Sequence, residues 1–319
     1  MFDGYVFVDE IPNKFDEPAV YIFTRPFNLS TVKRRSSLSL YTTALIKSVM
    51  ICDADVRESF EIISDCGLSY GIELPNKEIV TVKAFSYGSH TLNVIILFEY
   101  FDRYTLYAGR YIGNNKILEH VYLRKLMAKK KIDDLYIDVT SANITEFQFC
   151  RKACDEIQSL IRSKNDHKFH MIIDDFGYED LIFLLAKKGI KIYPDTKRVE
   201  IFNRQQISNV FCMDFQQAEV YLVDQLPDNV QKHYDETNIT WIKMTTDPKA
   251  YSCSGLEIIR FSIHPTMQDI LNIVNLAAPL KIYTIGKAGS LPFTLEHLCR
   301  FDDSGDKENQ SHLFLQTMP

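Results

Sequence analysis

The chain lacks several features that mark common classes of protein. Its seven cysteines are odd in number and form no CxxC pair, which argues against a disulfide framework and against a zinc ribbon. No apolar run approaches the ~18 residues that a membrane-spanning helix needs. The acidic N-terminal segment has no basic region of the kind that opens a signal peptide. We therefore expect a soluble intracellular protein with reduced thiols and no contact with a membrane.

The bulk composition is that of an ordinary globular protein. The chain has 319 residues, of which 46% are hydrophobic and 24% are charged. This length suggests two domains at roughly 100–200 residues each, and it allows a large core to be buried. The formal net charge of −6 means that any contact with nucleic acid has to come from local basic patches rather than from the whole molecule.

Alternating and β-branched segments dominate the first part of the sequence. The predicted strands there are 5–8, 20–23, 47–51, 78–84, 94–98, 105–108 and 135–139. The clearest helix in this part is 117–130, which carries several basic residues in its second half. The first part is therefore predicted to consist mostly of sheet.

The middle of the sequence changes to an alternation of helices and strands. Helical spacing of apolar residues predicts helices at 145–163 and 178–188, with strands at 170–173 and 190–193. This β-α-β order implies a parallel sheet. A strand at 256–262, a helix at 266–276 stopped by Pro279 and a strand at 281–285 follow, and the polar composition from 302 predicts a disordered tail.

Six segments, in order, resemble the Artemis-like branch of the β-CASP metallo-β-lactamase nucleases. They read VFVDEIPNKFD, EIVTVKAFSYGSHTLNVIILFE, TLYAGRYI, LYIDVTSAN, DDFGYEDLIFLLAKKGIKIY and IIRFSIHPTMQDILNIVNLAAPLKIYTI. Asp9, Asp138 and His264 stand at positions that match motif residues of that family. The resemblance runs from about residue 5 to 301, and the order and spacing of the segments carry it.

The resemblance implies an α/β fold, an αββα metallo-β-lactamase sandwich with an inserted β-CASP domain. It places a first part of the sandwich at 1–142, the β-CASP-like insert at 143–255, a second part of the sandwich at 256–301 and the tail at 302–319. Each of these boundaries is an expectation that depends on the resemblance.

The metal motifs of that family are degenerate in this chain. Catalysis there uses two metal ions, usually zinc, held by imidazole and carboxylate ligands. Where the family has HxHxDH, the ligand positions hold Arg25, Phe27, Leu29 and Ser30. The third-motif histidine falls near His90, and Arg110 replaces the bridging aspartate. We expect no bound metal, no cofactor and no catalytic residue.

Two former ligand positions now carry arginine, and two interpretations are open. In one, Arg25 and Arg110 form ion pairs with Asp9 and Asp138, because a buried charge has to be paired. In the other, an arginine holds a DNA phosphate through a bidentate contact. A working metal site is disfavoured because guanidinium groups would repel a cation there.

Two basic clusters are candidates for contacts with DNA phosphates, which dominate the affinity of proteins for DNA. They comprise Lys33, Arg34 and Arg35 after the degenerate loop, and Lys125, Lys129 and Lys130 near the end of the predicted helix 117–130. The alternative for both clusters is an ordinary solvated surface.

The resemblance implies a non-catalytic nuclear factor in DNA double-strand-break repair, acting in non-homologous end joining. Such a factor would bind DNA ends or hold the proteins of the end-joining machinery together. An inert subunit of an RNA 3′-end processing complex and a divergent metal-dependent DNA nuclease are the two alternatives. Fold alone does not decide among them.

Overall fold

The computed structural model describes most of the chain up to residue 285. The described residues are 4–11, 18–32, 38–86, 92–111, 120–129, 131–141, 150–164, 166–173, 176–195, 198–199, 202–203, 209–230, 234, 237–245, 247 and 249–285. The chain divides into two compact units, Met1–Thr145 with His264–Pro319, and Glu146–Ile263. The tail and the positions of His90, Lys33, Arg34, Arg35 and Lys130 lie outside the described residues.

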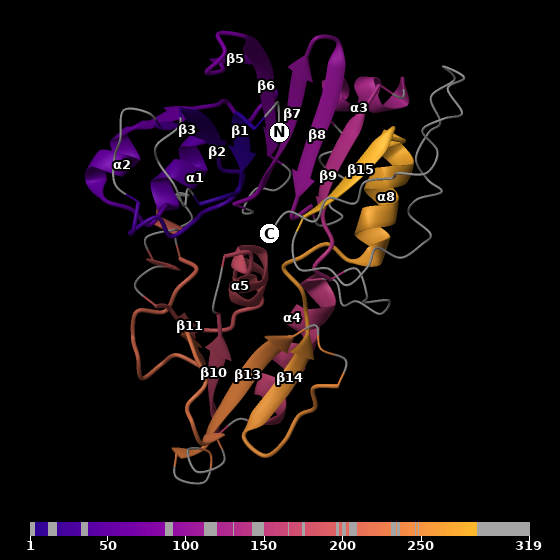
Figure 1. Cartoon of the computed structure of the whole chain (residues 1–319). Coiled ribbons are helices and arrows are strands. Elements are labelled where there is room, and N and C mark those ends of the chain that lie inside the picture. Colours follow the sequence, from indigo (N-terminus) through magenta and orange to yellow (C-terminus); the bar gives the residue numbers. More distant parts are fainter. Residues whose placement is uncertain are drawn as a thin grey trace. The chain divides into compact units, whose positions relative to one another are not determined.

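The first unit contains two sheets among its described residues (Figure 1). The N-terminal sheet is parallel, in the order β1-β2-β3-β4. Its strands are β1 (Val6–Val8), β2 (Ala19–Ile22), β3 (Leu38–Thr42) and β4 (Phe60–Ile62), and the helices α1 (Ala44–Val49) and α2 (Ala54–Glu58) lie between β3 and β4 in sequence.

The second sheet of this unit, called the mixed sheet below, has the order β15-β9-β8-β7-β6-β5. Its strands are β5 (Tyr70–Glu73), β6 (Ile79–Ser86), β7 (Val94–Tyr100), β8 (Arg103–Gly109), β9 (Asp134–Asp138) and β15 (Lys281–Ile285). The strands β5 to β8 run antiparallel, whereas β8, β9 and β15 run parallel. The last strand of the described chain thus completes a sheet that begins more than 200 residues earlier.

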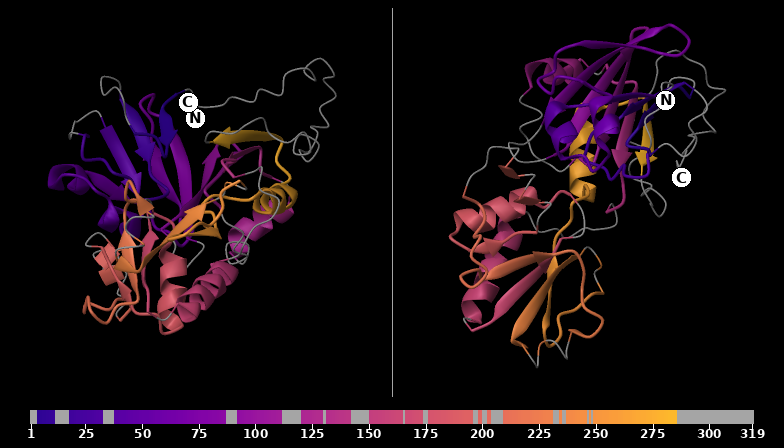
Figure 2. Two further views of the ribbon diagram at one scale, coloured as in Figure 1. Left: turned by 90° about the horizontal axis from the view of Figure 1, so that it is seen from below. Right: turned by 90° about the vertical axis from the view of Figure 1, so that its left-hand side faces the viewer.

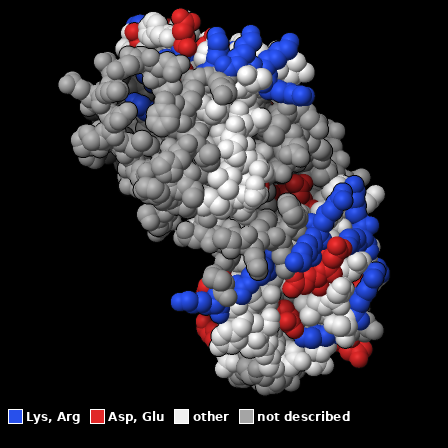
Figure 3. All heavy atoms as spheres, turned by 90° about the vertical axis from the view of Figure 1, so that its right-hand side faces the viewer, with Lys and Arg blue, Asp and Glu red and all other residues white. Residues whose placement is uncertain are grey.

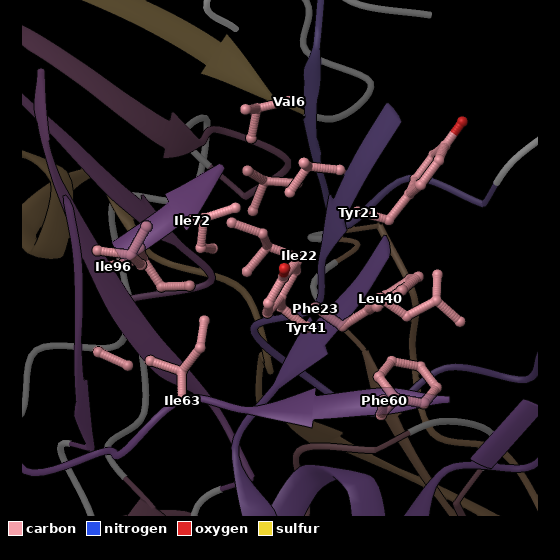
Figure 4. Packing of buried hydrophobic residues seen from close by; sticks show 14 of the residues in the cluster. Val6, Tyr21, Ile22, Phe23, Leu40, Tyr41, Phe60, Ile63, Ile72 and Ile96 are labelled. Carbon is pink, nitrogen blue, oxygen red and sulfur yellow. The ribbon is translucent and has the colours of Figure 1, made fainter. Parts of the chain in front are cut away.

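Two apolar cores hold the first unit together. The first core lies between the sheets, where Val6 and Ile22 of the N-terminal sheet meet Ile72 and Ile96 of the mixed sheet (Figure 4). The second core covers the opposite face of the mixed sheet with α3 (Val121–Ala128) and α8 (Met267–Ala277). Because both faces of the mixed sheet are covered, β7 is a continuous apolar run rather than an alternating one.

The second unit is built on a parallel sheet in the order β11-β12-β10-β13-β14. Its strands are β10 (Lys168–Ile172), β11 (Ile192–Tyr193), β12 (Val220–Val223), β13 (Ile239–Thr245) and β14 (Leu256–Arg260). The helices α4 (Cys150–Ser163) and α5 (Glu179–Lys187) pack together on one face of this sheet (Figure 2). The sequence prediction of a parallel β-α-β arrangement in this region is confirmed.

The α/β class predicted from the sequence is confirmed, and two details of that prediction are wrong. Segment 47–51 is not a strand, because Thr43 caps α1 and places Ile46 and Val49 on its buried side. The boundary expected at 255 also differs, because β14 pairs with β13 in the second unit, and the first unit resumes at His264. No helix within the described ranges is long and apolar enough to cross a membrane.

The start of α8 provides a local test of the fold. Thr266 accepts a hydrogen bond from the backbone N–H of Asp269, and the Asp269 carboxylate accepts one from the backbone N–H of Thr266. Both residues are buried. We expect Thr266→Ala to lower the free energy of unfolding by about 1–2 kcal/mol, measured by urea denaturation. Asn275→Ala, on the exposed side of the same helix, should stay within about 0.5 kcal/mol, and an equal loss in both variants would contradict the capping role.

Candidate functional site

The first half of the candidate site is a buried carboxylate at the end of β1. Asp9 has a φ of 56°, which turns the chain sharply as it leaves the strand. One carboxylate oxygen accepts the backbone N–H of Thr24 at 2.7 Å, and the other accepts the Thr24 hydroxyl at 2.6 Å. The Tyr107 hydroxyl donates to this second oxygen at 3.3 Å. The hydrogen bonds of Asp9 therefore connect the end of β1 to the loop after β2 and to β8.

Arg25 supplies a positive charge beside this carboxylate. Its Nε lies 3.9 Å from Oδ2 of Asp9, and its guanidinium lies 4.1 Å from the ring centroid of Phe27. The first distance is longer than a charge-assisted hydrogen bond, which measures about 2.7–2.9 Å, so this contact is an ion pair. Burial raises the pKa of Asp9, and the charge of Arg25 and the Thr24 hydrogen bonds offset only part of that rise.

The second half of the site is the carboxylate at the end of β9. Oδ1 of Asp138 accepts the backbone N–H of Thr140 at 2.8 Å and its hydroxyl at 2.5 Å. Oδ2 lies 2.7 Å from Nδ1 of His264 and 4.0 Å from Nε of Arg110. Burial alone would raise the pKa of Asp138, but the His264 and Thr140 contacts outweigh burial and hold this pKa below its usual value.

The two halves act on one another electrostatically. The charge of Arg110 lowers the pKa of Asp9 as well as pairing with Asp138. Burial first, and then the Asp9 and Asp138 carboxylates, raise the pKa of Tyr107 well above its usual value. We call the set Asp9, Arg25, Arg110, Asp138 and His264 the charged cluster. The structure thus brings together Asp9, Asp138 and His264, which the sequence resemblance singled out, and both arginines.

Backbone geometry places Arg110 in the cluster. Gly109 has a φ of +50°, and a Cβ there would lie 2.9 Å from Cε1 of Tyr107. Any larger residue would therefore strain the turn and push on the phenol that donates to Asp9. The chain reaches His264 through a parallel bridge between Ser141 and Thr266, which holds the segment before α8 beside the end of β9.

The remaining positions of the degenerate loop have structural roles. Leu29 is 1% exposed and lies in the first core. Phe27 packs edge-on against Phe23, and its backbone N–H donates to the Met50 sulfur. Ser30 is exposed, with its N–H donating to Asn28. Three of the four positions that the resemblance matched to metal ligands thus serve the core, the loop or the surface, and Arg25 is the one that joins the charged cluster.

These residues do not fit the two-metal centre that the family uses. Asp9, Asp138 and His264 are the donors that the described chain offers there, and Arg25 and Arg110 stand beside two of them. Across the described ranges, no group of three or more His, Cys, Asp or Glu side chains is arranged to hold a metal ion. A cation would meet two guanidinium charges in this cluster, so we derive no metal chemistry from it.

Basic side chains gather on the end of the first unit that carries α3 (Figure 3). Lys125 and Lys129 are exposed there, together with Arg124 and Lys131. Lys83, on the nearby strand β6, is instead buried and bound to Glu99 and the Tyr122 hydroxyl. The exposed residues of α3 are therefore the described part of the predicted phosphate-binding clusters.

A second buried ionic group lies in the second unit, where the sequence indicated no site. Arg198 is 1% exposed and pairs with Asp195, and its guanidinium also donates to the carbonyl of Ile173 at 3.1 Å. Glu179 is likewise 1% exposed and accepts the Gly177 N–H at 2.9 Å. Burial raises the pKa of Glu179 to about 7, although the charge of Arg198 opposes the rise.

Comparison with known proteins yields a fold and no function. No family model matches the chain, and no curated protein matches its sequence. Among the solved structures that match is the crystal structure of a protein of unknown function from Enterococcus faecalis V583. The match covers 86% of this chain and 76% of that one, with 13% sequence identity and a TM-score of 0.52. This likeness shows a shared fold alone.

The opposite pKa shifts of two aspartates on β9 give a paired prediction. Asp138 has a lowered pKa, so its contribution to stability is present above its unfolded pKa and is lost as pH falls through its folded pKa. Asp134 has a pKa raised by burial, so its contribution is present at low pH and is lost as pH rises through its folded pKa. Relative to wild type, Asp138→Asn should become less stable and Asp134→Asn more stable as pH rises from about 3 to 6.

Urea denaturation of both variants at several pH values in this range measures the two trends. Each variant is the control of the other, because both replace an aspartate by asparagine on the same strand. Parallel pH trends in the two variants would contradict the electrostatic description of the cluster.

Glu179 gives a further pH prediction in the second unit. Its pKa is raised from 4.5 to about 7, so wild type loses stability as pH rises through this range, by roughly 3 kcal/mol in total. Glu179→Gln retains an acceptor for Gly177 and does not ionise, so its stability relative to wild type should rise between pH 5 and 8. Amide hydrogen exchange in β10 measures this locally, and a pH-independent difference would contradict the raised pKa.

Proposed function

We propose that this chain is a non-catalytic member of the Artemis-like branch of the β-CASP metallo-β-lactamase family, which binds DNA ends in double-strand-break repair by non-homologous end joining. The observation that carries the proposal is the charged cluster. Asp9 and Asp138 lie at two strand ends, with Arg25 and Arg110 3.9 and 4.0 Å away, and His264 2.7 Å from Asp138. In the proposed family, metal ions would bind between these carboxylates, and here the arginines occupy that region as ion-pair partners.

The layout of the chain supports this proposal. Two sheets enclose one core, helices cover the far face of the mixed sheet, and a parallel α/β unit is inserted between β9 and α8. A metallo-β-lactamase sandwich interrupted by a β-CASP domain has this layout. The inserted unit runs from Glu146 to Ile263, so it begins shortly after Asp138 and ends directly before His264, and these two residues are hydrogen-bonded to one another.

The ion pairs explain how the fold would persist without a metal. Removal of one partner from a buried ion pair typically costs 3–5 kcal/mol, because the other charge stays buried without compensation. Each arginine therefore supplies the counter-charge for a buried carboxylate that would otherwise be uncompensated. Binding of DNA would then depend on surface charge, and exposed Lys125 on α3 and Lys129 directly after it are suited to contact phosphates.

Metal content and cleavage test the non-catalytic part of the proposal. The purified protein should hold no stoichiometric zinc and should leave hairpin and overhang DNA intact with added zinc, magnesium or manganese. Stoichiometric metal, with cleavage abolished by Asp138→Asn or His264→Ala, would identify a divergent nuclease. Co-purification with RNA 3′-end processing factors would instead favour an inert RNA-processing subunit.

Salt-dependent binding tests the DNA contact. The double variant Lys125→Ala with Lys129→Ala should weaken binding to a DNA end and reduce the slope of log affinity against log salt by roughly 2, since each lost phosphate contact removes about 0.9. The matched control is Lys77→Ala with Lys243→Ala, which removes two exposed lysines elsewhere. Fluorescence anisotropy over a salt series measures both, and an equal effect of the two double variants would refute a specific role for α3.

A further inference from the structure

Three tyrosine rings form a row across neighbouring strands of the mixed sheet. Tyr107 of β8 is opposite Tyr136 of β9, which is opposite Tyr283 of β15. The ring centroids of Tyr136 and Tyr283 are 4.5 Å apart with an interplanar angle of 9°, and those of Tyr107 and Tyr136 are 6.3 Å apart with an angle of 22°. The rings are thus nearly parallel and follow one another toward the edge of the sheet.

The row becomes more exposed along its length. Tyr107 is buried beside Asp9, whereas Tyr136 and Tyr283 are only partly buried. The strand β15 is the edge of the mixed sheet in the order of described strands (Figure 1). Over the part of the chain that the structure describes, Tyr136 is the ring that stacks on Tyr283, so the row ends at Tyr283 on the sheet edge.

Ion pairs flank the two outer rings along the strand direction. In one direction, Asp138 lies two residues beyond Tyr136, about 6.6 Å along the strand, and carries Arg110 and His264 with it. In the other direction, Asp134 pairs with Arg103 at 3.1 Å. Burial raises the pKa of the Tyr136 and Tyr283 phenols most, the Asp134 carboxylate raises it further, and the Arg103 charge lowers it, so both charges act on both rings. Each outer ring therefore lies between two groups of paired charges.

We propose that Tyr136 and Tyr283 form a stacking shelf for one unpaired nucleobase at a nucleic-acid end. The base extends the ring row by stacking on Tyr283, beside the exposed side chain of Arg103. Planar rings beside guanidinium groups are the elements by which proteins hold single-stranded nucleic acid. A base in a blunt terminal pair is held by its pairing partner, whereas an unpaired base can leave its own strand at lower cost and stack on a protein ring.

This inference rests on the proposed DNA-end binding and names the part of the end that is recognised. It also relates the retained cluster to that function. Asp9 and Tyr107 anchor the inner end of the ring row, so the hydrogen bonds that replaced metal ligation also fix the ring on which the outer pair is built.

Fluorescence of 2-aminopurine tests the shelf, because stacking on an aromatic ring quenches this base. Three probes are compared with the full chain: a duplex with an overhang that ends in 2-aminopurine, a blunt duplex with the same base in its terminal pair, and the 2-aminopurine mononucleotide. We expect quenching of the overhang alone. Tyr283→Ala and Tyr283→Leu should abolish the quenching and weaken overhang binding at least about fivefold.

Two control variants separate stacking from folding. Tyr283→Phe keeps the ring and should bind within about twofold of wild type, and Tyr251→Ala removes an exposed ring in the second unit and should change nothing. Tyr283→Leu keeps apolar bulk at the sheet edge if the alanine variant fails to fold.

The outcomes distinguish the shelf from the function on which it rests. Overhang binding that Tyr283→Leu leaves unchanged overturns the shelf and leaves DNA-end binding in place. Quenching of the mononucleotide without binding of any duplex would show that the shelf takes a free nucleotide. This result would overturn both the recognition of a nucleic-acid end and the proposed function. No binding of any of the three probes removes both proposals.

Discussion

The structure of the first unit depends on the need to compensate two buried carboxylates. Asp9 and Asp138 stand where β1 and β9 end, in positions 7% and 8% exposed at the side chain. A carboxylate in such a place either loses its charge or finds hydrogen bonds and a counter-charge. Both residues do the latter through a threonine and an arginine, and Asp138 adds a histidine. The ends of four strands and the loops between them are fixed by this compensation.

The two carboxylates are nevertheless not equivalent. At Asp9 burial prevails and raises its pKa, whereas at Asp138 the bonded His264 prevails and lowers it. The difference follows from distance, because an imidazole at 2.7 Å from Asp138 interacts far more strongly than a guanidinium nitrogen at 3.9 Å from Asp9. Of the two carboxylates, Asp138 is therefore the one whose ionised form is favoured by its surroundings.

Periodicity predicted those elements whose burial follows one simple pattern. The apolar run of β7 and the amphipathic helix α8 were predicted from sequence with bounds within a few residues of those observed. Segment 47–51 was wrong because a β-branched run was weighed without the Thr43 cap that starts α1. The strands β3, β4, β5, β12 and β13 were missed; β3 and β13 mix buried with exposed positions, and β4 and β5 are short edge strands. The boundary near 255 was wrong because nothing local in β14 tells which sheet it joins.

Only part of the candidate site was predicted, because its residues come from segments that are distant in sequence. Asp9, Asp138 and His264 are far apart in sequence, and the resemblance of their segments to one family is what grouped them. Thr24, Tyr107 and Thr140 complete their hydrogen bonds, but threonine and tyrosine are too common in strands and turns to attract notice. Thr140, two residues after Asp138, had the one readable signal, since aspartate often bonds the backbone two residues on.

The charge balance of the cluster limits what it can bind by itself. Arg25 and Arg110 carry two positive charges and Asp9 and Asp138 two negative ones, so the four groups sum to zero before His264 is counted. A phosphate that approached would compete with two carboxylates already in place, and the ion pairs would have to open to admit it. Affinity for a nucleic-acid end therefore has to come mainly from outside the cluster. Exposed lysines in and just after α3 can supply the long-range attraction, and the tyrosine row that begins at Tyr107 can supply a contact that does not depend on charge. Under the proposed function, the charged cluster would fix the strand ends beside the binding surface, and its ion pairs would stay intact when a nucleic-acid end binds.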